Sequence, residues 1–301
     1  MNTGNKVLRI WRHIEFSQNW KDCDTSSLDD IAASWFARRS TLQANSIDFK
    51  EFIERLKREH AIETGIIERL YSLSTGVTEK LIKEGFYSNL VSHGDTDVPT
   101  PVLMNHLNDH LEAVDFIFDT VINERPLSVS FIKQVHQLVT RHQESAEGRD
   151  QFGNKLKIPL LKGAFKIREN NPTRADGTLI LYCPPEHVEA EMDNLVQILG
   201  KLENDNIHPL IIAAWVHHAF ITIHPFQDGN GRVSRLLTSL ILIKAGFFPF
   251  TVLREEVKVR YFKSLELADD GKPGDFVAYL SKTQIRSIER ILNIREVSFI
   301  S

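Results

Sequence analysis

Apolar residues recur at helical spacing along most of the chain. A plausible N-cap at Ser27 is followed by apolar positions three and four residues apart, and the same period returns beyond residues 96–101. Two prolines lie in that segment, and prolines and the residues before them resist helix, so we expect a linker there. The pattern predicts helices over residues 27–36, 49–58, 62–73, 102–122, 126–142, 186–199, 208–223, 231–245, 255–268 and 275–292.

The helical period breaks between residues 144 and 176. Glycines punctuate this stretch, and short apolar runs occupy residues 155–161 and 178–182. Because turn-forming residues bound both runs, we expect two short strands that form one small hairpin. The predicted fold class is therefore all-α: a helical bundle with a small β-hairpin.

Composition narrows the function classes. The chain has 301 residues, 42% hydrophobic and 25% charged, with a net charge of −4, which is typical of a globular protein and gives no sign of a nucleic-acid partner. Two cysteines are too few for a disulfide framework. No apolar run is long enough to cross a membrane, and no signal peptide is evident. We expect a cytoplasmic protein that acts off the membrane; export by a dedicated secretion machine and a homo-oligomer stay open.

The most informative stretch is a loop between two apolar helical patterns. It reads His-Pro-Phe-Gln-Asp-Gly-Asn-Gly-Arg-Val-Ser-Arg over residues 224–235. Glycine and asparagine tolerate positive φ, so Asp228–Gly231 is strongly loop-forming. A helix that begins near Gly231 points its free N–H groups and the positive end of its dipole at this loop, which favours anion binding.

Charged side chains at this loop fit phosphate chemistry. Arg232 and Arg235 are neighbours on one helix face and can reach phosphate oxygens. Asp228 is a hard oxygen ligand suited to Mg²⁺ that bridges phosphates. His224 is placed to take a proton from an incoming hydroxyl. Asp-Gly-Asn-Gly alone is more simply explained as a tight turn, but the full combination within twelve residues favours a catalytic site.

This stretch resembles the signature of Fic-domain proteins, His-x-Phe-x-Asp/Glu-Gly-Asn-Gly-Arg-x-x-Arg, with every defined position filled. The similarity extends from about Ser128 to Tyr279 and includes residues 163–166 and 182–185. Lys166 stands where many members have arginine. The resemblance implies a protein adenylyltransferase, with residues 1–127 as an N-terminal helical region and 128–301 as the catalytic core and C-terminal helices.

The resemblance also implies roles. His224 would deprotonate a Ser, Thr or Tyr hydroxyl of a target protein, whose oxygen would attack the α-phosphate of ATP, and Asp228 would hold Mg²⁺. Phe226 would anchor the loop. A flap around residues 160–165 would hold the target's backbone by strand addition. The implied anion-binding residues are Gly229, Asn230, Gly231, Arg232 and Arg235, and the implied flap residues are Leu161, Lys162, Gly163 and Phe165.

Many Fic proteins also carry an inhibitory helix with the pattern Ser/Thr-x-x-x-Glu-Gly/Asn, whose glutamate pairs with the second arginine. The best candidate is Glu63, which we expect to pair with Arg235, although Glu59 and Thr64 depart from the pattern. Thr75-x-x-x-Glu79 has the spacing, but a lysine follows it. An ordinary surface glutamate explains Glu63 equally well.

Other interpretations stay open. The same site suits transfer of another phosphate-containing group or removal of AMP, and a retained fold suits a non-catalytic nucleotide- or protein-binding module. Intact His224 and Asp228 count against the module. His106 and His110 have the spacing of a zinc-binding pair but lack an evident third ligand. His136 and His142 are interpreted as ordinary helix-face residues.

Overall fold

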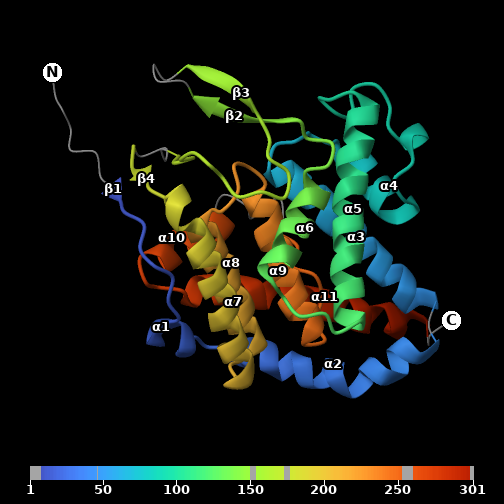
Figure 1. Cartoon of the computed structure of the whole chain (residues 1–301). Coiled ribbons are helices and arrows are strands. Elements are labelled where there is room, and N and C mark those ends of the chain that lie inside the picture. Colours follow the sequence, from blue (N-terminus) through green and yellow to red (C-terminus); the bar gives the residue numbers. More distant parts are fainter. Residues whose placement is uncertain (1–7, 46, 150–153, 173–176, 253–259, 299–301) are drawn as a thin grey trace.

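The computed structural model describes residues 8–45, 47–149, 154–172, 177–252 and 260–298. Helices dominate this part of the chain, and the strands are short (Figure 1). The all-α bundle with a small β element is therefore confirmed. The α-helices are α1 (Gln18–Lys21), α2 (Ser26–Asn45), α3 (Ile47–Ile67), α4 (Thr75–Glu84), α5 (Thr100–Ile122), α6 (Val129–Val139), α7 (Val188–Asn204), α8 (Pro209–Ile223), α9 (Asn230–Lys244), α10 (Phe262–Asp269) and α11 (Gly274–Ser298).

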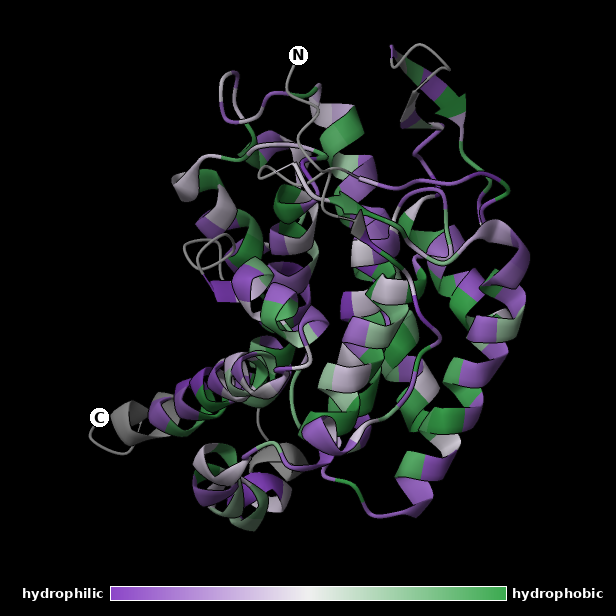
Figure 2. Ribbon diagram, turned by 90° about the vertical axis from the view of Figure 1, so that its left-hand side faces the viewer, coloured by the Kyte–Doolittle hydropathy of each residue, from purple (hydrophilic) through white to green (hydrophobic). Residues whose placement is uncertain are grey.

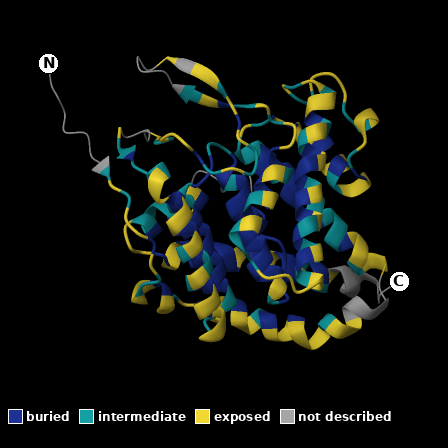
Figure 3. Cartoon of the chain, viewed as in Figure 1, coloured by how far each residue is buried: buried dark blue, intermediate teal, exposed yellow. Residues whose placement is uncertain are grey.

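Helices α8 and α9 form the centre of the bundle. They pack against each other, α8 also against α7 and α11, and α9 also against α3, α5 and α6. Both are buried around most of their circumference, as expected for helices with apolar residues on nearly every face. Figure 2 shows hydrophobic residues gathered on the inward faces of the surrounding helices, and Figure 3 shows the buried residues concentrated at this centre. The loop between α8 and α9 is thus anchored by the best-packed helices.

A smaller apolar cluster lies beside the main core. It joins the C-terminal end of α3 to α4 and to the start of α5, and its members include Ile62, Tyr71 and Leu81. Gly65 lies under the Tyr71 ring, which a β-carbon at that position would meet. This cluster fixes the direction in which α3 ends.

The strands pair differently from the sequence prediction. Strand β2 (Ser145–Arg149) pairs antiparallel with β3 (Lys155–Pro159), and β1 (Leu8–Arg9) pairs parallel with β4 (Leu179–Ile180). The expected hairpin between residues 155–161 and 178–182 is therefore wrong. The partner of β3 is the mostly polar β2, which lacks the apolar run that would have marked it as a strand. The partner of β4 is β1, near the N-terminus of the sequence. Figure 1 shows the β2–β3 hairpin projecting above the bundle.

Other differences are smaller. The two helices expected over 49–58 and 62–73 merge into one helix, α3, because no proline or glycine separates them, and α3 ends at Ile67, six residues before the expected end. Helix α4 was not predicted, and part of the helix expected over 255–268 lies outside the described residues. A domain boundary at 127/128 stays a prediction. Among the described helices, none combines the length and hydrophobicity needed to cross a bilayer.

Candidate active site

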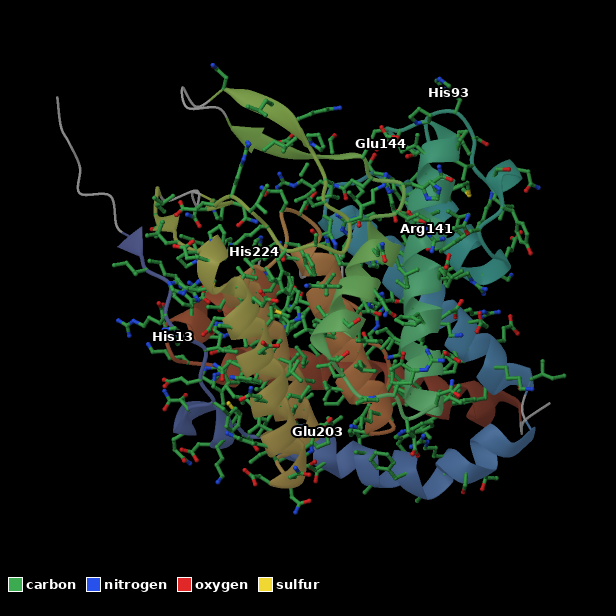
Figure 4. The ribbon with its side chains drawn as sticks, in the orientation of Figure 1. His13, His93, Arg141, Glu144, Glu203 and His224 are labelled. Carbon is green, nitrogen blue, oxygen red and sulfur yellow. The ribbon has the colours of Figure 1, made fainter. Side chains whose placement is uncertain are left out.

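His224 forms the C-terminal end of α8. It adopts the left-handed conformation (φ 52°, ψ 56°) that ends the helix and turns the chain into the loop. Its Nδ1 lies 3.3 Å from the carbonyl oxygen of Ile221. Because a carbonyl can only accept, Nδ1 carries the proton and Nε2 keeps a lone pair. Figure 4 shows His224 near the top of the bundle, below the β2–β3 hairpin. The geometry leaves Nε2 as the basic atom.

The surroundings keep this imidazole neutral. The Tyr182 ring stacks on it at 3.9 Å between centroids and 2° between planes. Burial, with the Lys166 ammonium nearby, lowers the pKa of His224 to about 3. Lys166 is itself buried, and burial lowers its pKa to about 8. His224 is therefore in the form that accepts a proton at neutral pH.

The loop after His224 is closed by its own side chains. Asn230 Oδ1 accepts from the Phe226 N–H at 2.9 Å, and Asn230 Nδ2 donates to the Phe226 carbonyl at 2.7 Å. Phe226 is fully buried and stacks on His136 at 3.8 Å. Gly229 has φ +80°, a conformation that costs other residues energy, and α9 begins at the next residue. This backbone conformation therefore favours glycine at residue 229.

The first turn of α9 offers an anion site. Its N–H groups have no carbonyl partner within the helix, and they carry the positive end of the helix dipole. Both arginines are buried. Arg232 donates to the Val139 carbonyl at 2.8 Å and to Gln143 Oε1, which holds it against the end of α6. Arg235 lies one turn further along and faces α3.

Asp228 lies at the rim of this cradle. Its carboxylate accepts from the Gly229 N–H at 2.6 Å and from Gln143 Nε2. Burial opposes ionisation, yet the Arg232 cation and these hydrogen bonds lower the pKa of Asp228. No group of three or more His, Cys, Asp or Glu in the described ranges can hold a metal. One anionic carboxylate beside a phosphate site fits Mg²⁺, which takes most of its ligands from phosphates and water.

The acidic partner of Arg235 is Glu68, the residue that directly follows α3. The Arg235 guanidinium donates to Glu68, to Thr64 Oγ1 at 3.3 Å and to the Tyr261 hydroxyl at 3.4 Å. The sequence pattern predicted this contact at Glu63, five residues earlier; the structure places Glu68 against Arg235, and an inhibitory role of Glu63 stays a prediction. A β-carbon at Gly231 would collide with the Glu68 carboxylate. Glu68 therefore lies directly against the first turn of α9.

The signal for Glu68 was present but incomplete. Thr64-Gly65-Ile66-Ile67-Glu68 has the family's spacing, with Arg69 where glycine or asparagine is usual. Arg69 has φ +57°, and the bonds from Leu70 N to Gly65 O and from Arg69 N to Ile66 O form a Schellman motif. The left-handed position after the helix explains the preference for glycine or asparagine, and an arginine there concealed the pattern.

Three further residues that contact the loop were not identified from the sequence. His136 on α6, Gln143 after α6 and Asn170 after β3 all bond the loop or its charged side chains. The residues bonded by His136, Gln143 and Asn170 lie 92, 85 and 56 residues away in sequence, respectively, and only the fold brings them together.

The flap residues expected from the sequence lie beside the loop. Leu161 is exposed, and Phe165 packs against the Phe226 ring at 5.6 Å. Strand β3 ends at Pro159, and residues 162–163 form a turn, so the strand-like conformation expected over residues 160–165 is wrong. Lys162 donates to the Arg141 carbonyl. Strand β3 of the β2–β3 hairpin precedes this turn, whereas β4 ends two residues before Tyr182, which stacks on His224.

The His106–His110 pair has another explanation. His110 is buried, and its ring lies 6.4 Å from the His60 ring. No third ligand joins the pair into a metal-binding group among the described residues. Burial, with the Arg232 cation nearby, lowers the pKa of both histidines of the pair.

Comparisons with known proteins agree with this geometry. Residues 126–242 match the model of the Fic/DOC family. The chain carries a Fic/DOC-family domain. It is 36% identical over 38% of its length to "Protein adenylyltransferase fic-1" of Caenorhabditis elegans, and 34% identical over 84% of its length to "Protein adenylyltransferase Fic" of Nematostella vectensis. The chain spans 22% and 52% of these relatives.

A solved structure supports the fold of this chain well beyond residues 126–242. The Fic-domain-containing signalling protein of Bacteroides thetaiotaomicron superposes with a TM-score of 0.70 at 25% identity. The superposition covers 88% of this chain and 95% of that one. The helices that surround α8 and α9 are therefore arranged similarly in the two proteins.

Proposed function

We propose that this Fic protein is a protein adenylyltransferase, which transfers AMP from Mg·ATP to a Ser, Thr or Tyr hydroxyl of a target protein. The observation that carries the proposal is the placement of a neutral histidine with a basic Nε2 at the entrance to a helix N-terminal anion cradle. Its relatives are named protein adenylyltransferases, which supports AMP as the group transferred.

The proposed reaction assigns each group one task. His224 Nε2 takes the hydroxyl proton as the target oxygen bonds to the α-phosphorus of ATP, and the bond to the β-phosphate oxygen breaks to release pyrophosphate. The N–H groups of the first turn of α9 and the Arg232 side chain hold phosphate oxygens. Arg235 does the same after Glu68 has moved away from it. Asp228 would hold Mg²⁺, which neutralises phosphate charge when bound.

Glu68 supports built-in inhibition of this reaction. Its carboxylate pairs with Arg235 and lies against Gly231, where the proposed triphosphate needs the same cation and amides. One anion then excludes the other, because both need the positive end of α9. We therefore assign the inhibitory role to Glu68.

The target protein would dock beside the loop at the β2–β3 hairpin. Leu156 on β3 and Leu161 after it are exposed. A hairpin edge can pair with an extended segment through main-chain hydrogen bonds, which tolerates many target sequences. Target residues near the modified hydroxyl would then be held close to His224.

Labelled nucleotides test the proposed activity. The Glu68→Gly protein is incubated with Mg²⁺ and each of the four α-³²P-labelled nucleoside triphosphates, alone and with a cell extract. We expect protein-bound label from ATP, and its loss in the Glu68→Gly/His224→Ala protein. Label from another triphosphate would correct the donor. No label from any triphosphate, with both proteins folded, would reject nucleotidyl transfer.

A further inference from the structure

Four successive carbonyl groups of the loop, from Pro225 to Asp228, each accept a hydrogen bond from outside the loop. The Lys166 N–H donates to Pro225 O at 2.8 Å. The carbonyl of Phe226 accepts from Asn170 Nδ2 at 2.8 Å, and that of Gln227 accepts from the same amide at 3.4 Å. The carbonyl of Asp228 lies 3.0 Å from His136 Nε2. Every peptide plane of this turn is therefore tied on its carbonyl edge.

The His136 side chain has one possible tautomer in this arrangement. The Gly163 N–H donates to its Nδ1 at 2.8 Å, so Nδ1 must hold a lone pair. Nε2 then carries the proton and donates to the Asp228 carbonyl. The ring also stacks on Phe226 with an 8° angle between planes. One buried side chain thus joins the flap segment to the loop.

The Asn170 amide is oriented in the same unambiguous way. Lys166 Nζ donates to its Oδ1 at 3.0 Å, which leaves the Nδ2 hydrogens for the loop carbonyls. The Lys166 side chain therefore acts on the loop through Asn170. Its backbone N–H acts directly, through Pro225.

Fixing the carbonyl edge of a peptide also fixes the opposite edge. A trans peptide carries its C=O and N–H on opposite sides, so tying the carbonyls of residues 226–228 aims the N–H groups of 227–229 the other way. The Gly229 N–H indeed points to the carboxylate of Asp228. If a plane turned over, a carbonyl dipole would face the phosphates and repel them.

We propose that His136 and Asn170 are positioning residues that hold the peptide planes between residues 226 and 229, so that the N–H groups of Gln227 and Asp228 face the triphosphate. This inference rests on the proposed function, because it assumes a phosphate ligand at the loop. Neither residue touches the reacting atoms. Both act by keeping the amides preorganised, which lowers the cost of binding phosphate.

Two amide substitutions at residue 136 separate the bonds that the histidine makes. The terminal amide of glutamine reaches the place of Nε2, so His136→Gln keeps the bond to Asp228. Asparagine reaches only the place of Nδ1, so His136→Asn keeps an acceptor for Gly163 and loses the loop bond. Both variants are made in Glu68→Gly protein, and Mg·ATP binding is measured by calorimetry beside kcat, KM and Tm.

We expect His136→Asn to weaken Mg·ATP binding about tenfold, and His136→Gln to stay within about threefold, because only asparagine releases a carbonyl of the cradle. A purely structural role would move Tm without separating the two variants in ATP affinity. Equal ATP affinity of the two variants would overturn the inference.

Asn170→Asp gives an independent test if the histidine variants fail to fold. It keeps the size of the side chain but replaces the donor to Phe226 with an acceptor. Asn171→Asp is the matched control: Asn171 accepts from the Tyr182 N–H at 2.9 Å and keeps that ability as aspartate, and of its hydrogen bonds it loses the exposed one from Nδ2 to Glu169. We expect a loss of Mg·ATP affinity of about tenfold at 170 and a clearly smaller one at 171. The reverse order would overturn the inference.

The proposed function can fail separately. If Glu68→Gly protein binds Mg·ATP and transfers AMP while the amide variants behave alike, only the inference on His136 and Asn170 is lost. If Glu68→Gly protein neither binds Mg·ATP nor transfers any nucleotide, the proposed function and this inference are both rejected.

Discussion

The N-terminus of α9 and the C-terminus of α3 meet at Arg235, and they differ in how plainly the sequence shows them. Each end has a residue in the left-handed conformation: Gly229 at φ +80° before α9 and Arg69 at φ +57° after α3. The first is a glycine within a recognisable motif. The second is an arginine, which gives no local sign of a helix end. The same backbone geometry is therefore visible in one sequence and concealed in the other.

The two ends also carry opposite electrostatic character. The start of α9 is positive through its free N–H groups, whereas the end of α3 carries the negative end of its dipole and the Glu68 carboxylate. Their contact is thus a match of charge as well as shape. The comparison indicates that the Glu68 carboxylate is held by the same positive charge that would bind phosphate. Removing Glu68 should therefore leave the phosphate site open and otherwise unchanged.

The largest expected effect follows from that competition. Glu68→Gly should raise the rate of self-adenylylation by about 10- to 100-fold, the range of a typical coupling free energy between competing sites. The measurement is incorporation of α-³²P-AMP with time at saturating Mg²⁺. Glu63→Gly, within α3 and five residues before Glu68, is the control, and it should change the rate little. A rise with Glu63→Gly and none with Glu68→Gly would return the inhibitory role to the residue expected from the sequence.

The sequence predicted those features that depend on neighbours along the chain. The helical period located most helices, and the glycines at 229 and 231 located the turn before α9. The residues 224–235 were identified as one site because their chemistry lies within a single stretch. Glu68 required knowledge that Arg69 adopts a left-handed conformation, which an arginine does not announce.

Features that depend on distant pairing were not predicted. The polar strand β2 was missed because it has almost no apolar alternation, and β3 was consequently paired with the wrong segment. His136 looked like an ordinary helix residue, since its partners Gly163 and Asp228 are supplied by two other parts of the fold. Such contacts are set by packing and leave no local pattern.

Acid should lower the free energy of unfolding through His60, which lies on α3. This ring is fully buried on α3, two turns before Glu68, and its Nε2 lies 3.5 Å from Ser239 Oγ on α9. Burial, with the Arg235 cation, lowers the pKa of His60 to about 3. The unfolded chain binds this proton below about pH 6.5, but the folded chain does not. Stability present above pH 6.5 is therefore lost as the pH falls toward 3.

The expected loss can be measured by urea unfolding at pH 7 and pH 5. A single histidine of this kind contributes a decrease of about 2 kcal/mol in the free energy of unfolding between those values. His60→Gln should show a decrease smaller than wild type by about that amount. Equal decreases in the two proteins would show that His60 takes up its proton in the folded state as well.

The smallest expected effect tests the two left-handed positions directly. Arg69→Gly should raise the free energy of unfolding by about 0.5–1 kcal/mol. Glycine removes the steric cost of the left-handed conformation, and this gain exceeds the conformational entropy that glycine loses on folding. Gly229→Ala should lower it by about 1–2 kcal/mol, since alanine pays the αL cost and its β-carbon would lie 3.2 Å from Thr140 Cγ2. Urea unfolding at neutral pH measures both. Changes of the same sign would mean that the two helix ends are not equivalent in backbone strain, and the concealed pattern at Arg69 would then need a different explanation.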